Sequence, residues 1–163
     1  NYDGENLKKA CKILTELKCP FIINQNRYSI FDRTIENNGL KQTAVELKKG
    51  IIAFSPLAQG LLTNRYLNGI PSDSRAAKDS RFLKQSAITD EKIAKIKALS
   101  KIAEQRGQTL AETALAWVLK DGAVTSVLIG ASKPSQILDN IKAIQNTSFS
   151  VEELEAIDKI SLD

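Results

Sequence analysis

The stretch from Val124 to Asn140, VTSVLIGASKPSQILDN, decides the fold class that we predict for this chain. Its apolar run 127–129 predicts a short buried strand, and the turn that follows leads into a helix. A helix that begins directly after a strand exposes unpaired backbone N–H groups and the positive end of its dipole. With Ser132, Lys133 and Gln136 beside it, this corner predicts either a phosphate site or an ordinary strand-to-helix turn with a solvated lysine.

Two other apolar runs, Phe21–Ile23 and Ile51–Phe54, also have the length and composition of buried strands. Amphipathic spacing and capping residues predict helices at Asp3–Lys18, Asn37–Lys49, Thr89–Gly107, from Thr109 onward and from Ser150 onward. The first two strands and their helix span about 30 residues, as in a βαβ unit with parallel strands. The fold class is therefore α/β, with the sheet inside. Three strands alone would leave open edges, so part of a barrel fits better than a complete domain.

The composition narrows the possible functions. The chain of 163 residues has no histidine, which removes the commonest general base and the commonest metal ligand. Its net charge of +4 comes from lysines spread over the helices, so we expect a solvated surface and no nucleic-acid partner. The apolar runs are too short for membrane insertion and the two cysteines form no disulfide framework, so we expect a cytoplasmic location. Because the chain starts at Asn1 and lacks methionine, we expect a piece of a longer protein.

Polar loops follow all three predicted strands, at Asn24–Ser29, Ser55–Gly60 and Gly130–Gln136. Ligands of parallel α/β folds bind at the carboxyl ends of the strands, where we expect these loops to converge. The long basic segment 61–87 is expected to be either a binding lid or a disordered insertion. Together with the aromatic ring of Phe54, the loops predict a site for a phosphorylated ligand that carries a flat ring.

Three segments of the chain carry a family resemblance. They are Phe54–Gly60, Asn64–Pro71 with Ser74 and Arg75, and Val127–Ser132 with Gln136, Asp139 and Asn140. In this order they resemble the aldo-keto reductase family, in the branch that includes potassium-channel β-subunits and bacterial reductases of glyceraldehyde-type aldehydes. The resemblance runs from Asn1 to the end of the chain.

The resemblance implies a parallel (β/α)8 TIM barrel, of which this chain supplies the C-terminal part, about strands six to eight and their helices. Residues 1–163 would then form an incomplete barrel domain, the cofactor-binding half, with 61–87 as a long loop that covers the cofactor. The isolated half would expose strand edges and an apolar inner layer. We therefore expect it to associate with the missing N-terminal half of the barrel or with itself.

The resemblance also implies NADP(H) as the cofactor. By similarity, Asn1 and Gln25 would hydrogen-bond the nicotinamide carboxamide, and Phe54 would stack against the nicotinamide ring. The remaining residues that the resemblance assigns to the cofactor are Ser55, Pro56, Leu57, Gln59 and Gly60 after the second strand, Arg65 and Arg75 on the covering loop, and Gly130, Ser132, Lys133, Gln136, Asp139 and Asn140 after the third strand. The first group would line the pyrophosphate, and the last would hold the adenosine 2′-phosphate and adenine.

The chemistry of the family is hydride transfer to a carbonyl, with a tyrosine as general acid assisted by lysine, aspartate and histidine. Those residues come from strands two to four, so we assign no catalytic residue to this chain. Tyr28 follows a predicted strand, but nothing in the sequence gives it a cationic partner that would lower its pKa of about 10. The resemblance thus implies an intact reductase of small aldehydes or ketones. A regulatory NADPH-sensing subunit and a complete three-stranded nucleotide-binding module are the alternatives.

Overall fold

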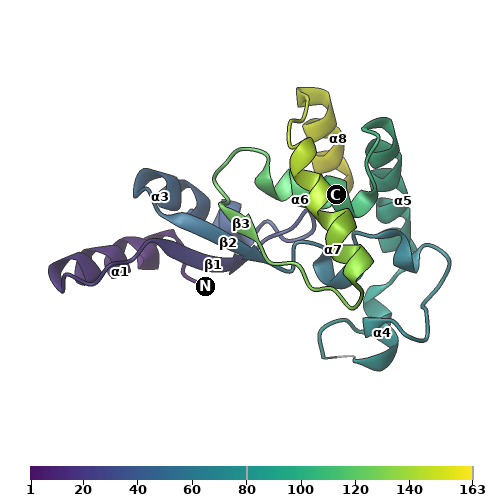
Figure 1. Cartoon of the computed structure of the whole chain (residues 1–163), viewed down its shortest axis with the longest axis horizontal. Helices are drawn as coiled ribbons and strands as arrows, with labels where there is room; N and C mark the ends of the chain where they lie inside the picture. The colour runs from purple at the N-terminus through teal and green to yellow at the C-terminus, as the bar shows by residue number, and fades with distance from the viewer. Residues whose placement is uncertain (80, 163) are drawn as a thin grey trace.

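The sheet is built from three parallel strands in the order β1 (Ile23–Arg27), β2 (Gly50–Phe54) and β3 (Ser126–Val127) (Figure 1). This computed structural model describes residues 1–79 and 81–162, apart from the side chain of Arg75. In the register of β1 and β2, Gln25 lies opposite Ile52 and Arg27 lies opposite Phe54. The predicted α/β class with a parallel sheet is therefore confirmed.

The connections between the strands are helical. The α-helices are α1 (Gly4–Glu16) before β1, α2 (Thr34–Asn37) and α3 (Leu40–Glu46) between β1 and β2, α4 (Arg75–Lys78), α5 (Asp90–Gln105) and α6 (Leu110–Leu119) between β2 and β3, and α7 (Pro134–Asn140) and α8 (Val151–Leu162) after β3. Short 3₁₀ helices lie at η1 (Ala58–Gly60), η2 (Asn64–Tyr66), η3 (Gln85–Ala87) and η4 (Ile141–Gln145). No helix of the described residues combines the length and the apolar composition that crossing a membrane requires.

Helix starts follow the capping residues of the sequence. Asp3 Oδ1 accepts a hydrogen bond of 2.7 Å from the Asn6 amide at the start of α1. At α6, the Glu112 amide donates to Thr109 Oγ1 at 3.2 Å and the Thr109 amide donates to Glu112 Oε2 at 2.9 Å. Each cap satisfies N–H groups that the first turn of a helix leaves unpaired. The predicted starts of these helices are confirmed.

The first strand begins two residues and ends four residues later than the apolar run predicts. β1 consists of Ile23–Arg27, whereas Ile22 is 75% exposed. The side chains of Asn24 and Asn26 are buried, because the Asn24 amide donates to Asn26 Oδ1 and the Asn26 amide donates to the Tyr2 carbonyl at 3.1 Å. The prediction of a polar loop at Asn24–Ser29 was therefore wrong for its first four residues, which belong to the strand.

The helix predicted over Asn37–Lys49 is interrupted at Gly39, whose φ of 73° separates α2 from α3. Gly50 does not end this helix, because it is the first residue of β2 and the left-handed residue is Lys48, with φ of 52°. A Cβ atom on Gly50 would lie 2.8 Å from Thr125 Oγ1. Gly50 thus allows the chain before β3 to approach β2 closely. In the sequence alone, a glycine at this position is also typical of a helix end.

The third strand is shorter and more exposed than predicted. β3 contains only Ser126 and Val127, and Leu128 is 45% exposed. Among the described strands, β3 pairs with β2 alone, so nothing on its other side extends the ladder. The following helix, predicted from near Ser135, begins at Pro134 and continues as the 3₁₀ helix η4.

The two faces of the sheet differ in burial. Asn24, Asn26, Ile51 and Ala53 alternate along β1 and β2 on the face toward the helices, and all four are buried. Gln25, Arg27, Ile52 and Phe54 lie on the opposite face, which we call the open face, and these four are exposed or half-buried. The open face and the unpaired outer edges of β1 and β3 make the sheet consistent with part of a barrel.

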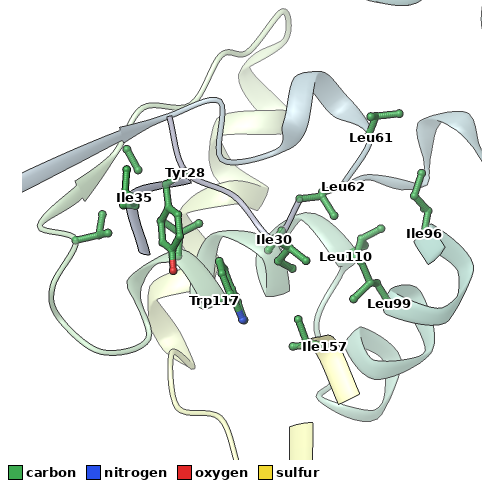
Figure 2. Packing of buried hydrophobic residues seen from close by; sticks show 14 of the residues in the cluster. Tyr28, Ile30, Ile35, Leu61, Leu62, Ile96, Leu99, Leu110, Trp117 and Ile157 are labelled. Carbon is green, nitrogen blue, oxygen red and sulfur yellow. The ribbon is translucent and has the colours of Figure 1, made fainter. Parts of the chain in front are cut away.

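The hydrophobic core lies among α5, α6, α8 and the segments that follow β1 and β2 (Figure 2). Trp117 is fully buried beside Tyr28, with their ring centroids 5.2 Å apart. Segment 61–87 is not a disordered insertion, because η2, α4 and η3 lie within it. It also contributes to the core through Leu62 and Tyr66.

Candidate functional site

A groove with a volume of about 810 Å³ lies where the chain leaves β2 and β3. Its walls come from the loop after β2, segment 61–87, the start of α6, and the loop after β3 with α7. The residues that line it are Ser55, Pro56, Leu57, Gln59, Gly60, Thr63, Arg65, Tyr66, Asp73, Ser74, Lys78, Asp79, Thr109, Ala111, Leu128, Ile129, Gly130, Ala131, Ser132, Gln136, Asp139 and Asn140. This volume is typical of ligand pockets, which measure roughly 300–1,000 Å³.

The groove brings together most of the residues that the sequence singled out. These are Ser55, Pro56, Leu57, Gln59, Gly60, Arg65, Gly130, Ser132, Gln136, Asp139 and Asn140. The loops after β2 and β3 therefore converge, as expected for the carboxyl ends of neighbouring parallel strands. The loop after β1 contributes no residue to the groove lining, so the expected convergence of three loops is found for two of them.

Four of the sequence-predicted residues lie outside the groove lining. Asn1 is exposed at the start of the chain, and Lys133 is exposed before α7. Gln25 and Phe54 lie on the open face of the sheet, Phe54 directly before the first groove residue, Ser55. A fifth residue, Arg75, opens α4, but its side chain falls outside the described part of the structure.

The loop after β2 has an unusual backbone. Ser55, Ala58 and Gln59 have φ values of 55°, 48° and 62°, in the left-handed region that non-glycine residues seldom adopt. The Gln59 side-chain amide donates to Ser55 Oγ at 2.8 Å and closes the loop on itself. Such backbone strain is concentrated at ligand-binding and catalytic sites, where the surrounding structure imposes it. Three such residues within five positions therefore support a binding role for this loop.

The corner before α7 is held by Gln136. Gln136 Oε1 accepts hydrogen bonds from the Ser132 amide at 2.8 Å, the Ser132 hydroxyl at 3.2 Å and the Lys133 amide at 3.2 Å. The expectation of unpaired N–H groups at this corner was therefore wrong for these two amides. A phosphate could bind these two amides only by replacing the side-chain carbonyl oxygen of Gln136.

Two of the charged residues of the groove form an ion pair that is open to solvent. Arg65 Nη2 lies 2.8 Å from Asp73 Oδ1, and the Asp73 side chain is 63% exposed. The hydrogen bond from Arg65 holds the pKa of Asp73 below its usual value. The sequence did not single out Asp73, because it follows no strand and its segment has no clear periodicity. Lys78 was expected at the site only as one of the basic residues of segment 61–87. Thr109 was identified as a helix cap, but not as part of the site.

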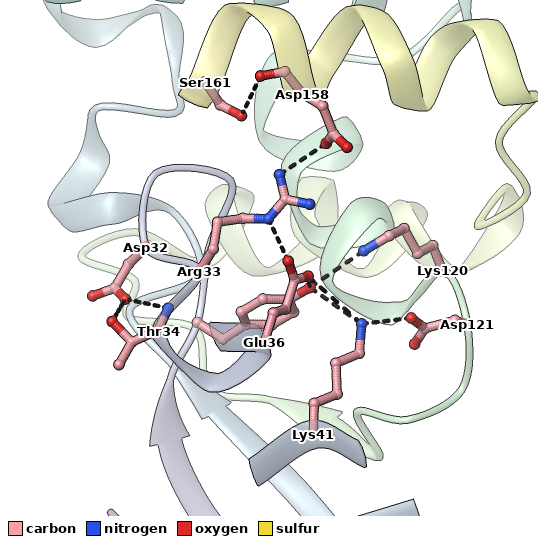
Figure 3. A network of polar contacts seen from close by, with 10 residues as sticks. Asp32, Arg33, Thr34, Glu36, Lys41, Lys120, Asp121, Asp158 and Ser161 are labelled. Atoms are coloured by element: carbon pink, nitrogen blue, oxygen red, sulfur yellow. Dashed lines mark hydrogen bonds and ion pairs between the residues drawn. The ribbon is translucent and has the colours of Figure 1, made fainter. Parts of the chain in front are cut away.

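A second charged cluster lies outside the groove, and we call it the Tyr28 network (Figure 3). Its members are Tyr28, Arg33, Glu36, Lys41, Lys120, Asp121 and Asp158. The Tyr28 hydroxyl donates to Glu36, and it also receives Lys120 Nζ at 3.3 Å and Lys41 Nζ at 3.4 Å. Tyr28 thus has the two cationic neighbours that the sequence did not reveal.

The environment nevertheless keeps the Tyr28 hydroxyl protonated. Burial, followed by the hydrogen bond to Glu36, raises the pKa of Tyr28 well above its ordinary value. Burial also lowers the pKa of Lys120 to about 8, and the neighbouring positive charge of Lys41 adds to this effect. A tyrosine with a raised pKa, buried against Trp117, is a poor proton donor near neutral pH.

Within the described residues, no cluster of three or more histidine, cysteine, aspartate or glutamate side chains could hold a metal ion. The donors of the groove are amides, hydroxyls, backbone groups, Arg65 and Lys78. This set suits an elongated ligand that carries phosphate groups, because phosphates bind backbone N–H groups and cations.

Comparisons with known proteins agree with the motifs. The model of the Aldo/keto reductase family matches residues 1–162. Two proteins named L-glyceraldehyde 3-phosphate reductase, from Escherichia coli O157:H7 and Escherichia coli strain K12, are each 43% identical to this chain over 162 residues. Each match covers 98% of this chain and 47% of the relative. The chain thus spans about half the length of the curated relatives it matches.

Proposed function

The chain belongs to the aldo/keto reductase family, and from this premise we propose that it is the cofactor-binding part of an NADP(H)-dependent oxidoreductase that reduces aldehydes or ketones. The groove at the carboxyl ends of β2 and β3 carries this proposal, because it joins the segments through which the chain resembles the family. The intact protein would act on a small carbonyl compound.

We propose further that β1, β2 and β3 are about strands six to eight of a (β/α)8 barrel. The open face of the sheet would then be the barrel interior, and the free edges of β1 and β3 would pair with strands of the missing half. Exposed apolar side chains, such as Leu17 directly after α1 at 70% and Leu138 on α7 at 61%, would pack against the helices of that half. Sedimentation of the isolated chain should show self-association, and a stable monomer would contradict this architecture.

The cofactor would lie along the groove. NADPH supplies a hydride to the carbonyl when it is bound. Phe54 would stack against its nicotinamide ring, with Asn1 and Gln25 holding the carboxamide. Groove residues from Ser55 to Gly60 would line the pyrophosphate, and Arg65 would add positive charge there. The family resemblance implies the same role for Arg75.

The far end of the groove would hold the adenosine part of the cofactor. Ser132, Gln136 and Asn140 line this end, and Lys133 lies beside it with an exposed side chain. A lysine at this corner favours the additional 2′-phosphate of NADPH over the free hydroxyl of NADH. The proton donor would come from outside this chain, and a cytoplasmic location stays a prediction.

Titration of the full-length protein with NADPH tests the proposal. The variants Phe54→Ala and Lys133→Ala should weaken NADPH binding about tenfold each, because each removes a contact worth about 1.4 kcal/mol. Lys101→Ala, which changes an exposed lysine on α5, serves as the control. Unchanged NADPH affinity in both variants would rule out the site. Tight NADPH binding without reduction of any aldehyde would favour the regulatory, NADPH-sensing alternative.

A further inference from the structure

Arg27 is an exposed cation on the open face of the sheet, next to Phe54. It is the last residue of β1, and it lies opposite Phe54 in the parallel register. Its guanidinium carbon is 5.7 Å from the centroid of the Phe54 ring. Gln25 precedes it by two positions and therefore shares its face. Arg27 thus stands beside the residues that we assign to the nicotinamide.

The guanidinium of Arg27 has almost no partner of its own. Its side chain is 58% exposed, and its ion pair with Asp32 is long, with 3.9 Å between Nε and Oδ2. The described residues give this guanidinium no hydrogen bond. The side chains of Arg33 and Arg106, by contrast, are largely buried, and they make ion pairs of 2.7–2.8 Å. The hydrogen-bonding capacity of Arg27 is therefore available to a ligand.

A guanidinium that makes only one long ion pair and no hydrogen bond among the described residues suits an anionic ligand. Its planar fork matches the oxygens of phosphate and carboxylate, and two parallel hydrogen bonds fix the orientation of the bound group. The guanidinium carbon of Arg27 is 5.7 Å from the centre of the Phe54 ring, on which the nicotinamide would stack. A small substrate whose carbonyl reaches the nicotinamide could therefore also reach the guanidinium with an anionic group. Larger uncharged aldehydes would gain nothing from this contact.

We propose that Arg27 is a specificity-determining residue that binds the phosphate group of a short phosphorylated aldehyde. This inference rests on the proposed function, since it requires the nicotinamide to stack on Phe54. Arg27 orients the substrate through its anionic group and takes no part in proton transfer. The phosphates of the cofactor are the other possible source of an anion here, and the experiment below separates the two.

The test compares glyceraldehyde 3-phosphate with uncharged glyceraldehyde as substrates of the full-length protein. The variant Arg27→Gln should lower kcat/KM for the phosphorylated aldehyde by about 10- to 100-fold, mainly through KM, because a charge-assisted contact is lost. The kcat/KM for glyceraldehyde and the Kd for NADPH should change by less than about twofold. Arg27→Lys keeps the charge and should restore part of the loss, and Lys101→Gln is the matched control.

Four results would overturn the proposal. Equal losses with both aldehydes, together with weaker NADPH binding, would assign Arg27 to the cofactor. Unchanged kinetics with both aldehydes would leave the residue without a role in recognition. If the unmodified protein binds no NADPH, the proposed function fails, and the role of Arg27 fails with it. If the unmodified protein binds NADPH but reduces both aldehydes equally well, only the role of Arg27 is overturned. Thermal melting of each variant shows that it is folded.

Discussion

The groove and the Tyr28 network are both rich in charged side chains, yet their contacts differ in kind. In the network, partners come from distant parts of the chain, as in the ion pairs of Arg33 with Asp158 and of Lys41 with Asp121. In the groove, partners are near neighbours and exposed, as in the pairing of Arg65 with Asp73. Distant pairs with a largely buried cation fix the arrangement of helices, whereas local pairs that are open to solvent can be replaced by a ligand without disturbing the fold.

The location of Trp117 strengthens this contrast. Lys120 Nζ lies 3.6 Å and the Arg33 guanidinium carbon 4.6 Å from the centroids of its rings. The network thus joins α2, α3, α6 and α8 over one buried aromatic side chain. Burial would raise the pKa of Glu36, but hydrogen bonds from Tyr28 and Arg33 hold it below its ordinary value. The carboxylate is therefore charged and fully engaged at neutral pH.

The largest effect should follow from removing that carboxylate. Glu36→Ala leaves Arg33, Lys41 and Tyr28 without their shared acceptor, so we expect the free energy of unfolding to fall by about 3 kcal/mol. Asp73→Ala in the groove should change it by less than about 0.5 kcal/mol, because exposed ion pairs contribute little. Urea unfolding of the full-length variants measures both. Equal losses would show that the two clusters do not differ in the way that we describe.

The second prediction concerns the pH dependence of stability. Burial lowers the pKa of Lys120 from 10.5 to about 8 in the folded chain. Between these two values the unfolded chain holds a proton that the folded chain has released, so stability should rise as the pH increases from about 8. The raised pKa of Tyr28 acts in the opposite direction, but only above about pH 10, where an unfolded tyrosine ionises.

We therefore expect the free energy of unfolding to increase by about 1–2 kcal/mol between pH 8 and 10 through this lysine. Lys120→Met should abolish that increase, while Lys101→Met, on the exposed side of α5, should leave it unchanged. Thermal or urea unfolding at several pH values provides the measurement. A rise of the same size in Lys120→Met would assign it to another group.

The contrast also explains how much the sequence could predict. The groove loops were recognisable because polar and turn residues follow the apolar runs directly, as at Ser55 and Gly130. The strand β1 was misplaced because its buried residues include Asn24 and Asn26, whose side chains hydrogen-bond to each other and to the Tyr2 carbonyl. A search for hydrophobic periodicity does not detect buried polar pairs of this kind. The partners of Tyr28 were invisible because Lys120 is 92 positions away, where only the folded helices bring the two together.

The smallest effect that we predict is a change in NADPH affinity when Asp73 is replaced. It tests whether a ligand can replace the contact between Asp73 and Arg65. Asp73 occupies part of the hydrogen-bonding capacity of Arg65, and its carboxylate also repels a phosphate. Asp73→Asn should therefore raise the affinity of the full-length protein for NADPH by about threefold, within the range of an exposed ion pair.

Glu104→Gln, which removes an exposed negative charge from α5, should have no such effect. The gain should shrink at high ionic strength, since salt screens exposed charges. Weaker NADPH binding by Asp73→Asn would instead mean that the pair holds segment 61–87 in place, and the contacts of the groove would then resemble those of the network.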